Sequence, residues 1–199
     1  MWTLYDNLDS GNGYKVRLAL SQLEIPYRLV EVDSVHGETR TRAFLAKNPN
    51  GRVPLLEVEP GDYLPESNAI LHYIASGSTL IPEGELARAR MLSWMFFEQY
   101  SHEPYVATSR FILRHTPEDS PRRAELSWRQ PRAHEALAVM EQQLAKTPFL
   151  CGRYSLADIA LYAYTHRAHE GGIELAPYPA IRAWLTRVEA TPRYVPMLS

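Results

Sequence analysis

Apolar positions in the first part of the chain switch between strand spacing and helix spacing. Short apolar or alternating runs predict strands over residues 2–6, 27–32, 53–58 and 63–64. Longer segments with apolar residues three or four apart predict helices over residues 12–23, 39–47 and 67–76. The order βαβαββα predicts an α/β domain with a mixed sheet, and we expect Ala43, Phe44 and Leu45 to face inward.

The pattern changes at residues 76–85, which are rich in small and turn-forming residues and contain Pro82. We interpret this segment as a linker between a domain at residues 1–78 and an all-helical domain at residues 86–199. Every later periodic segment has helix spacing, and these segments cover residues 86–115, 122–146, 154–169 and 179–190. We expect the first of these helices to bend near Pro104 and the second to be irregular at Pro131.

Ser155 and Asp158 have the spacing of a helix-start signature. The Ser155 hydroxyl can accept from the Asp158 N–H, and the Asp158 carboxylate can reach back to the Ser155 N–H. Tyr154 can pack against Ile159 just outside this cap. We interpret the pair as structural, and its loss should cost about 1 kcal/mol.

Two short segments combine features of a binding surface. Val53-Pro54 heads an apolar strand, where proline is tolerated, and a cis bond there would turn the Val53 N–H and C=O outward. Glu66 and Ser67 stand at a predicted helix start, which offers free N–H groups and partial positive charge. Together they indicate a docking surface for a peptide-like ligand with a carboxylate and an amine. The alternative is that the first merely begins a strand and the second merely caps a helix.

Ser10, Gly11 and Asn12 follow the first predicted strand and open the first predicted helix. Serine and asparagine are both preferred N-cap residues. From spacing alone, a purely structural cap and a chemical role remain equally open.

Composition limits the partners and the cellular compartment expected for the protein. The chain has 199 residues with a formal net charge of -2, which gives no argument for nucleic acid or for an anionic membrane surface. It shows neither a signal-peptide pattern at its start nor an apolar run of membrane-spanning length. The single Cys151 excludes internal disulfides, so we expect a cytoplasmic protein. We find no partner at ligand spacing for His102 or His166, so no metal site is predicted.

Five segments, taken in order, resemble the cytosolic glutathione transferase superfamily, and specifically its bacterial serine-type members. They span most of the chain and comprise residues 10–17, 48–54, 66–71, 155–160 and 178–188. The resemblance implies a thioredoxin-like N-terminal domain and an all-helical C-terminal domain. It also implies a homodimer that uses glutathione as a co-substrate and acts on a small electrophile.

The resemblance also implies how glutathione is held. The Val53 backbone before a cis Pro54 would pair with the cysteinyl part, and Glu66 would hold the ammonium. Ser67 would hold the γ-glutamyl carboxylate through its hydroxyl and N–H. Arg52 falls near the glycyl end. Weaker candidates for the glycine carboxylate are His36 and Arg40, for which a solvated surface charge is the alternative.

By the same resemblance, the Ser10 hydroxyl would act on the glutathione sulfur with Asn12 as an auxiliary group. Tyr5 is the other option in the family, and we interpret it as a packing residue. No cysteine lies near Ser10, which disfavours subclasses that form a mixed disulfide with the protein. The electrophile would enter between the domains, against walls formed by Asn7, Leu8, Tyr105, Ser109, Arg110, Leu113 and Arg114.

The expected activity is conjugation of the glutathione thiolate to small electrophiles. Alternatives are another glutathione-dependent reaction (isomerisation, dehalogenation or disulfide reduction), a non-catalytic interaction module of the same fold, and a protein that sequesters apolar compounds. Arg110 and Arg114 lie one helical turn apart and would favour an anionic substrate, unless they form a solvated or ion-paired face.

Overall fold

The computed structural model describes residues 1–198, which divide into two compact units. The first unit contains residues 1–78 together with residues 192–198, and the second contains residues 79–191. The sequence placed the whole end of the chain in the helical domain, whereas the last described residues belong to the first unit. They are held there because the Tyr14 hydroxyl donates to the Val195 carbonyl (2.8 Å) and the Ser21 hydroxyl donates to the Arg193 carbonyl (2.9 Å).

The first unit is built on a four-stranded mixed sheet of order β2-β1-β3-β4. Its strands are β1 (Trp2–Asp6), β2 (Tyr27–Glu31), β3 (Leu55–Glu59) and β4 (Asp62–Pro65). β1 runs parallel to β2 and antiparallel to β3, which is antiparallel to β4. The helices are α1 (Gly11–Gln22), α2 (Arg42–Leu45) and α3 (Ser67–Ile74). The predicted thioredoxin-like arrangement is confirmed.

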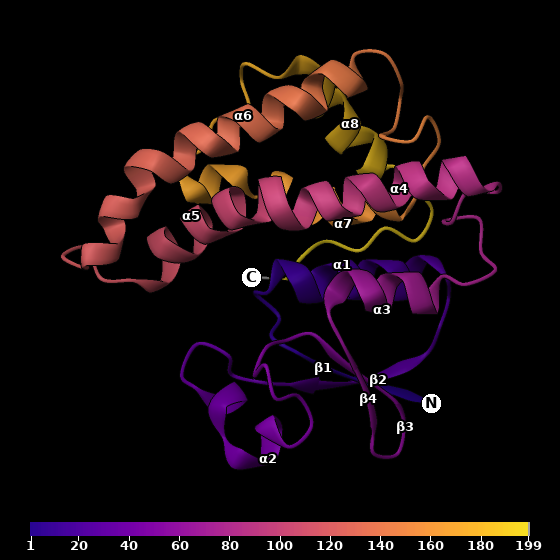
Figure 1. Cartoon of the computed structure of the whole chain (residues 1–199), viewed down its shortest axis with the longest axis vertical. Helices are drawn as coiled ribbons and strands as arrows, with labels where there is room; N and C mark the ends of the chain where they lie inside the picture. Colours follow the sequence, from indigo (N-terminus) through magenta and orange to yellow (C-terminus); the bar gives the residue numbers. More distant parts are fainter. Residues whose placement is uncertain (199) are drawn as a thin grey trace. The chain divides into compact units, whose positions relative to one another are not determined.

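The alternation of side chains along β1 and β3 gives the sheet two buried faces. Tyr5 and Leu55 pack with Phe44 of α2 on one face. Leu4 and Leu56 are opposite each other in the register and point to the other face, where α1 and α3 lie side by side (Figure 1). The sheet therefore carries the starts of α1 and α3 on the same side.

The prediction of one continuous helix over residues 39–47 is wrong. The structure has a 3-10 turn, η1 (Glu38–Arg40), and then the four-residue α2. Thr41 separates them because it is extended (φ -66°, ψ 150°) and its hydroxyl accepts the Phe44 N–H at 3.3 Å, as an N-cap does. Phe44 is buried, but Ala43 is exposed and Leu45 only half-buried, so the expected inward face reduces to one residue.

The second unit is helical, as predicted. Its helices are α4 (Glu85–Phe97), α5 (Glu103–His115), α6 (Leu126–Leu144), α7 (Leu156–Thr165) and α8 (Pro179–Glu189), with the shorter turns η2 (Glu98–His102), η3 (Pro121–Glu125) and η4 (Ala168–Gly171). The irregularity expected near Pro104 is the π-helical turn η2, which ends just before it, because proline has no N–H to donate. Pro131 stays inside α6. Within residues 1–198, no helix has the length and apolarity to span a membrane.

All ten residues of α7 are buried, and Asp158 organises its start. Both bonds of the predicted capping box are present, with the Ser155 N–H donating to the Asp158 carboxylate at 3.0 Å. The same carboxylate accepts from the Leu150 N–H (3.0 Å) and from the indole N–H of Trp184 (2.9 Å). Burial raises the pKa of Asp158 to about 6, and these donors oppose that rise. One side chain thus joins α7, α8 and the preceding loop.

We expect Asp158→Ala to lower the free energy of unfolding by about 3–5 kcal/mol, because three buried N–H donors lose their acceptor. Urea unfolding followed by tryptophan fluorescence measures this change. Asp119→Ala, at an exposed aspartate in a turn of the same unit, is the matched control and should change stability by less than about 0.5 kcal/mol. Equal effects of the two variants would contradict the structural role of Asp158.

Candidate functional site

Ser10 caps the first turn of α1. Its Oγ accepts the Gly13 N–H at 3.2 Å, and its backbone is extended (φ -78°, ψ 119°). The cap uses a lone pair of the hydroxyl oxygen and leaves the hydrogen, which has no acceptor within residues 1–198. The two interpretations of Ser10 are therefore compatible, since one hydroxyl can cap the helix and donate to a ligand.

The loop that leads to Ser10 is fixed from two sides. The Asn7 side chain donates to the Val32 carbonyl (3.3 Å) and accepts the Asp9 N–H (3.0 Å), and the Asn7 carbonyl accepts the Ser10 N–H (2.9 Å). The Leu8 carbonyl accepts from the Arg17 guanidinium at 2.9 Å. Asn7 and Leu8, which the sequence assigned to the electrophile site, thus have a visible role in holding the loop before Ser10.

Asp6 lies directly beneath the first turn of α1. Its carboxylate is completely buried, and a Cβ built on Gly13 would lie 1.6 Å from the Asp6 Oδ1, so only glycine fits there. The Arg17 guanidinium pairs with the carboxylate at 2.8 Å. Burial raises the pKa of Asp6 to about 7, and Arg17 opposes this only in part.

Asn12 connects the starts of α1 and α3. The Ser67 hydroxyl donates to the Asn12 Oδ1 at 3.2 Å, and the Lys15 ammonium donates to the same oxygen at 2.7 Å. Lys15 is completely buried. The sequence analysis did not select Lys15, although its place three residues after Asn12 on one helix was a usable signal.

Glu66 is the residue before α3 and has an unusual backbone, with φ 69° and ψ 112°. Its side chain is exposed and has no hydrogen-bond or ion-pair partner within residues 1–198. Ser67, by contrast, is buried at the first position of α3. The two predicted anchors therefore sit at one helix N-terminus, where unpaired N–H groups attract anions.

The predicted cis bond between Val53 and Pro54 is present. Within residues 1–198, neither the N–H nor the C=O of Val53 has a backbone hydrogen-bond partner. The approach to it is shaped by Asn48, whose side chain donates to the Arg52 carbonyl (2.9 Å) and accepts the Asn50 N–H (3.1 Å). Asn48 is a positioning residue that the sequence analysis missed, while Arg52 is exposed.

The two weaker candidates for the glycyl end both have protein partners. The His36 ring lies 2.7 Å from the Asp33 carboxylate in an exposed turn. Hydrogen bonds from the His36 backbone and ring lower the pKa of Asp33. The Arg40 guanidinium donates to the Asn50 carbonyl at 3.1 Å.

Tyr5 lies away from the first turn of α1, in a polar cluster on the face of the sheet that packs against α2. Its hydroxyl donates to the Glu57 carboxylate (3.0 Å) and accepts from the Lys47 ammonium (2.8 Å). Lys47 also lies 4.1 Å from the centre of the Tyr5 ring. These contacts agree with the packing role expected for Tyr5.

The second unit places the predicted arginines in an ion-pair cluster. Glu170 accepts from Arg110 (2.6 Å) and lies close to Arg114 (3.3 Å) and Arg167 (3.0 Å). Burial alone would raise the pKa of Glu170, but the three guanidinium groups, Arg110 foremost, bring it below its ordinary value. The ion-paired alternative for Arg110 and Arg114 is thus what the structure contains.

The other predicted wall residues of the second unit differ in exposure. Ser109 is completely buried, and its hydroxyl has no hydrogen-bond partner within residues 1–198. Leu113 is half-buried. The Tyr105 ring makes an edge contact with Trp128.

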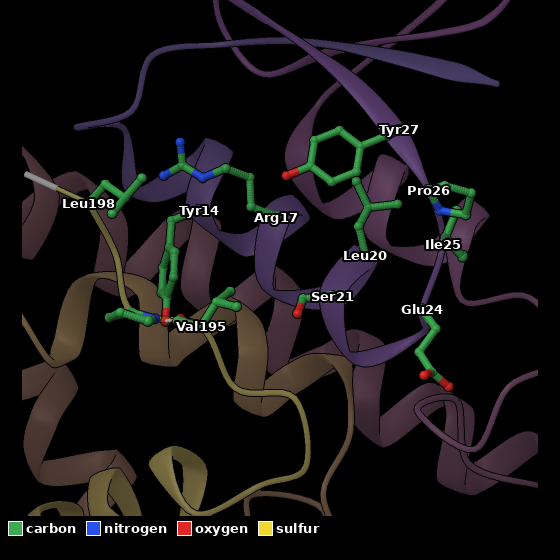
Figure 2. Close-up of a pocket in the computed structure, with 11 residues that line it drawn as sticks. Tyr14, Arg17, Leu20, Ser21, Glu24, Ile25, Pro26, Tyr27, Val195 and Leu198 are labelled. Carbon is green, nitrogen blue, oxygen red and sulfur yellow. Dashed lines mark hydrogen bonds between the residues drawn. The ribbon is translucent and has the colours of Figure 1, made fainter.

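Each unit also contains a cavity away from the predicted residues. In the first unit, a cavity of about 590 Å³ lies between α1 and the end of the chain, with Tyr14, Arg17, Tyr27, Val195 and Leu198 in its lining (Figure 2). In the second unit, a cavity of about 540 Å³ is lined partly by Trp94 and Cys151. Neither contains a residue of the predicted glutathione or electrophile sites.

Comparison with known proteins gives the family. Residues 1–76 match the model "Glutathione S-transferase, N-terminal domain", and residues 118–187 match "Glutathione S-transferase, C-terminal domain". The crystal structure of a glutathione S-transferase from Pseudomonas fluorescens [Pf-5] has a TM-score of 0.95 and 52% identity, covering 100% of this chain and 99% of that one. The chain belongs to the glutathione S-transferase family.

Two further relatives are informative about ligand and reaction. A theta class glutathione S-transferase from Xanthomonas axonopodis pv. citri, solved with glutathione bound, has a TM-score of 0.88 and 29% identity, covering 97% of this chain and 94% of that one. Disulfide-bond oxidoreductase YfcG from Escherichia coli (strain K12) is 31% identical over an alignment of 189 residues that covers 91% of this chain and 87% of that protein. Similarity therefore extends to proteins named for different reactions.

The raised pKa of Asp6 predicts how its contribution to stability depends on pH. A carboxyl group with a folded pKa of about 7 and an ordinary unfolded value stabilises the fold most below about pH 4, and this stabilisation is lost as pH rises to about 7. The stability advantage of the natural protein over Asp6→Asn should therefore fall by up to about 1.4 kcal/mol per pH unit across that range. Urea unfolding of both proteins from pH 4 to 8 measures it. An advantage that grows with pH would mean that the Arg17 ion pair outweighs burial.

Proposed function

We propose that the first unit binds glutathione across the starts of α1 and α3 and the backbone at Val53. The proposal rests chiefly on the Asn12–Ser67 hydrogen bond, which brings the start of α1 next to the start of α3. The donor hydrogen of Ser10, the unpaired Val53 backbone and the exposed Glu66 carboxylate all belong to the same unit. They fit a tripeptide with a thiol, a peptide backbone and an amino-acid head.

Each of these residues then has a distinct part in binding. Glu66 pairs with the γ-glutamyl ammonium, and the N-terminus of α3 with the Ser67 hydroxyl holds the neighbouring carboxylate. Val53 donates and accepts one backbone hydrogen bond with the cysteinyl residue, as in strand addition. Arg52 is exposed beside Val53 and serves the glycyl carboxylate.

Ser10 donates its hydroxyl hydrogen to the glutathione sulfur, supported by the positive end of α1. A thiol of pKa near 8.5 is only about 3% ionised at pH 7, and lowering its pKa by about 2 units raises the thiolate about 25-fold. A thiolate of lower pKa is also a weaker nucleophile, and its intrinsic reactivity falls about 8-fold. The net gain in rate is therefore about 3-fold. Placing the electrophile beside the sulfur must therefore supply most of the rate.

The reaction we propose is transfer of the glutathione thiolate to a small electrophile, catalysed by a cytoplasmic homodimer. Membership of the glutathione S-transferase family supports it. Conjugation needs only a thiolate and an acceptor, which agrees with the absence of any cysteine other than Cys151 from the chain.

Glutathione-dependent disulfide reduction is the second candidate, and the similarity to an oxidoreductase favours it. In that reaction the thiolate held by Ser10 would attack one sulfur of the substrate disulfide instead of a carbon, forming a disulfide with glutathione and releasing the other sulfur as a thiol. Assays with chlorinated aromatics, isothiocyanates and mixed disulfides separate the two. If the protein turned over mixed disulfides but none of the other substrates, disulfide reduction would be its reaction and conjugation would be refuted.

Ser10→Ala should lower the turnover number by up to about threefold and leave the affinity for glutathione nearly unchanged, because the lost bond acts on the thiolate. Steady-state kinetics with calorimetry of glutathione binding separate the two quantities. Thr41→Ala is the matched control, since it also removes an N-cap hydroxyl from the first unit, and it should leave turnover unchanged. Loss of binding with unchanged turnover of the bound complex would refute the role of Ser10.

Glutathione binding itself is tested by calorimetry on the natural protein and on Glu66→Gln. We expect the neutral side chain to weaken binding about tenfold, because it loses a charge-assisted bond to the ligand ammonium. Glu59→Gln, an exposed glutamate at the end of β3, should bind like the natural protein. Absence of any binding to the natural protein would remove the proposed function altogether.

A further inference from the structure

The oxygen of the Asn12 side chain is held by two donors from different helices. One is the Ser67 hydroxyl at the start of α3 (3.2 Å), and the other is the Lys15 ammonium within α1 (2.7 Å). The Lys15 side chain has an exposed fraction of 0%. A buried ammonium is unfavourable unless it is well hydrogen-bonded, so this contact differs from a surface lysine resting on its neighbour.

The chemistry of these donors fixes which way the Asn12 amide points. An ammonium has three donor hydrogens and no acceptor, so the atom that it contacts must be the amide oxygen. The oxygen and nitrogen ends of an asparagine are nearly equal in shape, and only hydrogen bonds decide between them. Lys15 thus turns the N–H₂ end of Asn12 away from itself and from Ser67.

We infer that Lys15 is a positioning residue of the glutathione site, an inference that rests on the proposed function. In that function the Ser67 hydroxyl turns from Asn12 to the carboxylate of the ligand, and Lys15 is the donor that continues to hold Asn12. The Asn12 N–H₂ end is then kept as a second donor at the start of α1, beside the Ser10 hydroxyl. We assign Lys15 no contact with the ligand, and its hydrogen bond to Asn12 is the route by which it acts on the site.

Lys15→Met tests the inference, because methionine fills a similar buried volume without donors. We expect turnover with glutathione to fall about tenfold, while the dissociation constant for glutathione rises less than about threefold. Lys146→Met, at an exposed lysine of the second unit, is the matched control and should match the natural protein. Loss of glutathione affinity with unchanged turnover would overturn the inference.

A double-mutant cycle separates positioning from a general structural effect. If Lys15 acts only through Asn12, adding Lys15→Met to Asn12→Ala should change turnover less than about twofold. A further tenfold loss in that background would show that Lys15 acts by another route. Should Lys15→Met not fold, Asn12→Asp replaces it, because it keeps acceptors for Lys15 and Ser67 but removes the N–H₂ group. Full turnover by Asn12→Asp would equally overturn the inference.

A readout without glutathione keeps this inference distinct from the proposed function. The side-chain amide of Asn12 gives a nitrogen–proton NMR signal pair, identified by its loss in Asn12→Ala. In the ligand-free protein this pair should shift or broaden in Lys15→Met and stay in place in Lys146→Met. An unchanged pair in Lys15→Met would refute the positioning role even if glutathione binds. A shifted pair in a protein that does not bind glutathione would sink the proposed function and leave the hold on Asn12 intact.

Discussion

The close contact between the Gly13 backbone and the Asp6 carboxylate constrains the whole first unit. It sets how near the first turn of α1 can lie to the end of β1, and any side chain at position 13 would occupy the place of the carboxylate. Arg17 completes the arrangement by binding both Asp6 and the Leu8 carbonyl. The position of the Ser10 hydroxyl follows from this packing, since the cap and the loop before it are built on the same turn.

The candidate site depends on residues that lie just outside the helices and strands. Val53 lies just before β3, Glu66 just before α3 and Ser10 just before α1. Within residues 1–198 the Val53 backbone has no backbone partner, whereas the carbonyls of Glu66 and Ser10 accept the N–H groups of Ile70 and Tyr14 in the helices that follow. Element ends are where unpaired N–H and C=O groups occur. Side-chain amides then hold these ends in place, with Asn48 acting before Val53 and Asn12 acting between the two helices.

Two carboxylates of the second unit, Asp158 fully buried and Glu170 partly buried, show how the type of hydrogen-bond partner sets the direction of a pKa shift. Asp158 is surrounded by neutral N–H and O–H donors, which do not overcome burial, and its pKa is raised. Glu170 is surrounded by three guanidinium groups, which do overcome burial, and its pKa is lowered. The contacts give the two residues different roles, since Asp158 accepts N–H groups at a helix start and Glu170 pairs with a basic cluster.

The sequence by itself determined the elements, the mixed sheet, the capping box and the residues at the starts of α1 and α3, because these features follow from local periodicity, caps and proline. Tertiary structure alone decided the interruption at Thr41, the docking of residues 192–198 on the first unit, and the partners of Lys15 and Arg110. Each of these depends on which distant atoms meet. Spacing along one chain shows that Arg110 and Arg114 share a helix face, but only packing brings Glu170, some 60 residues later, between them.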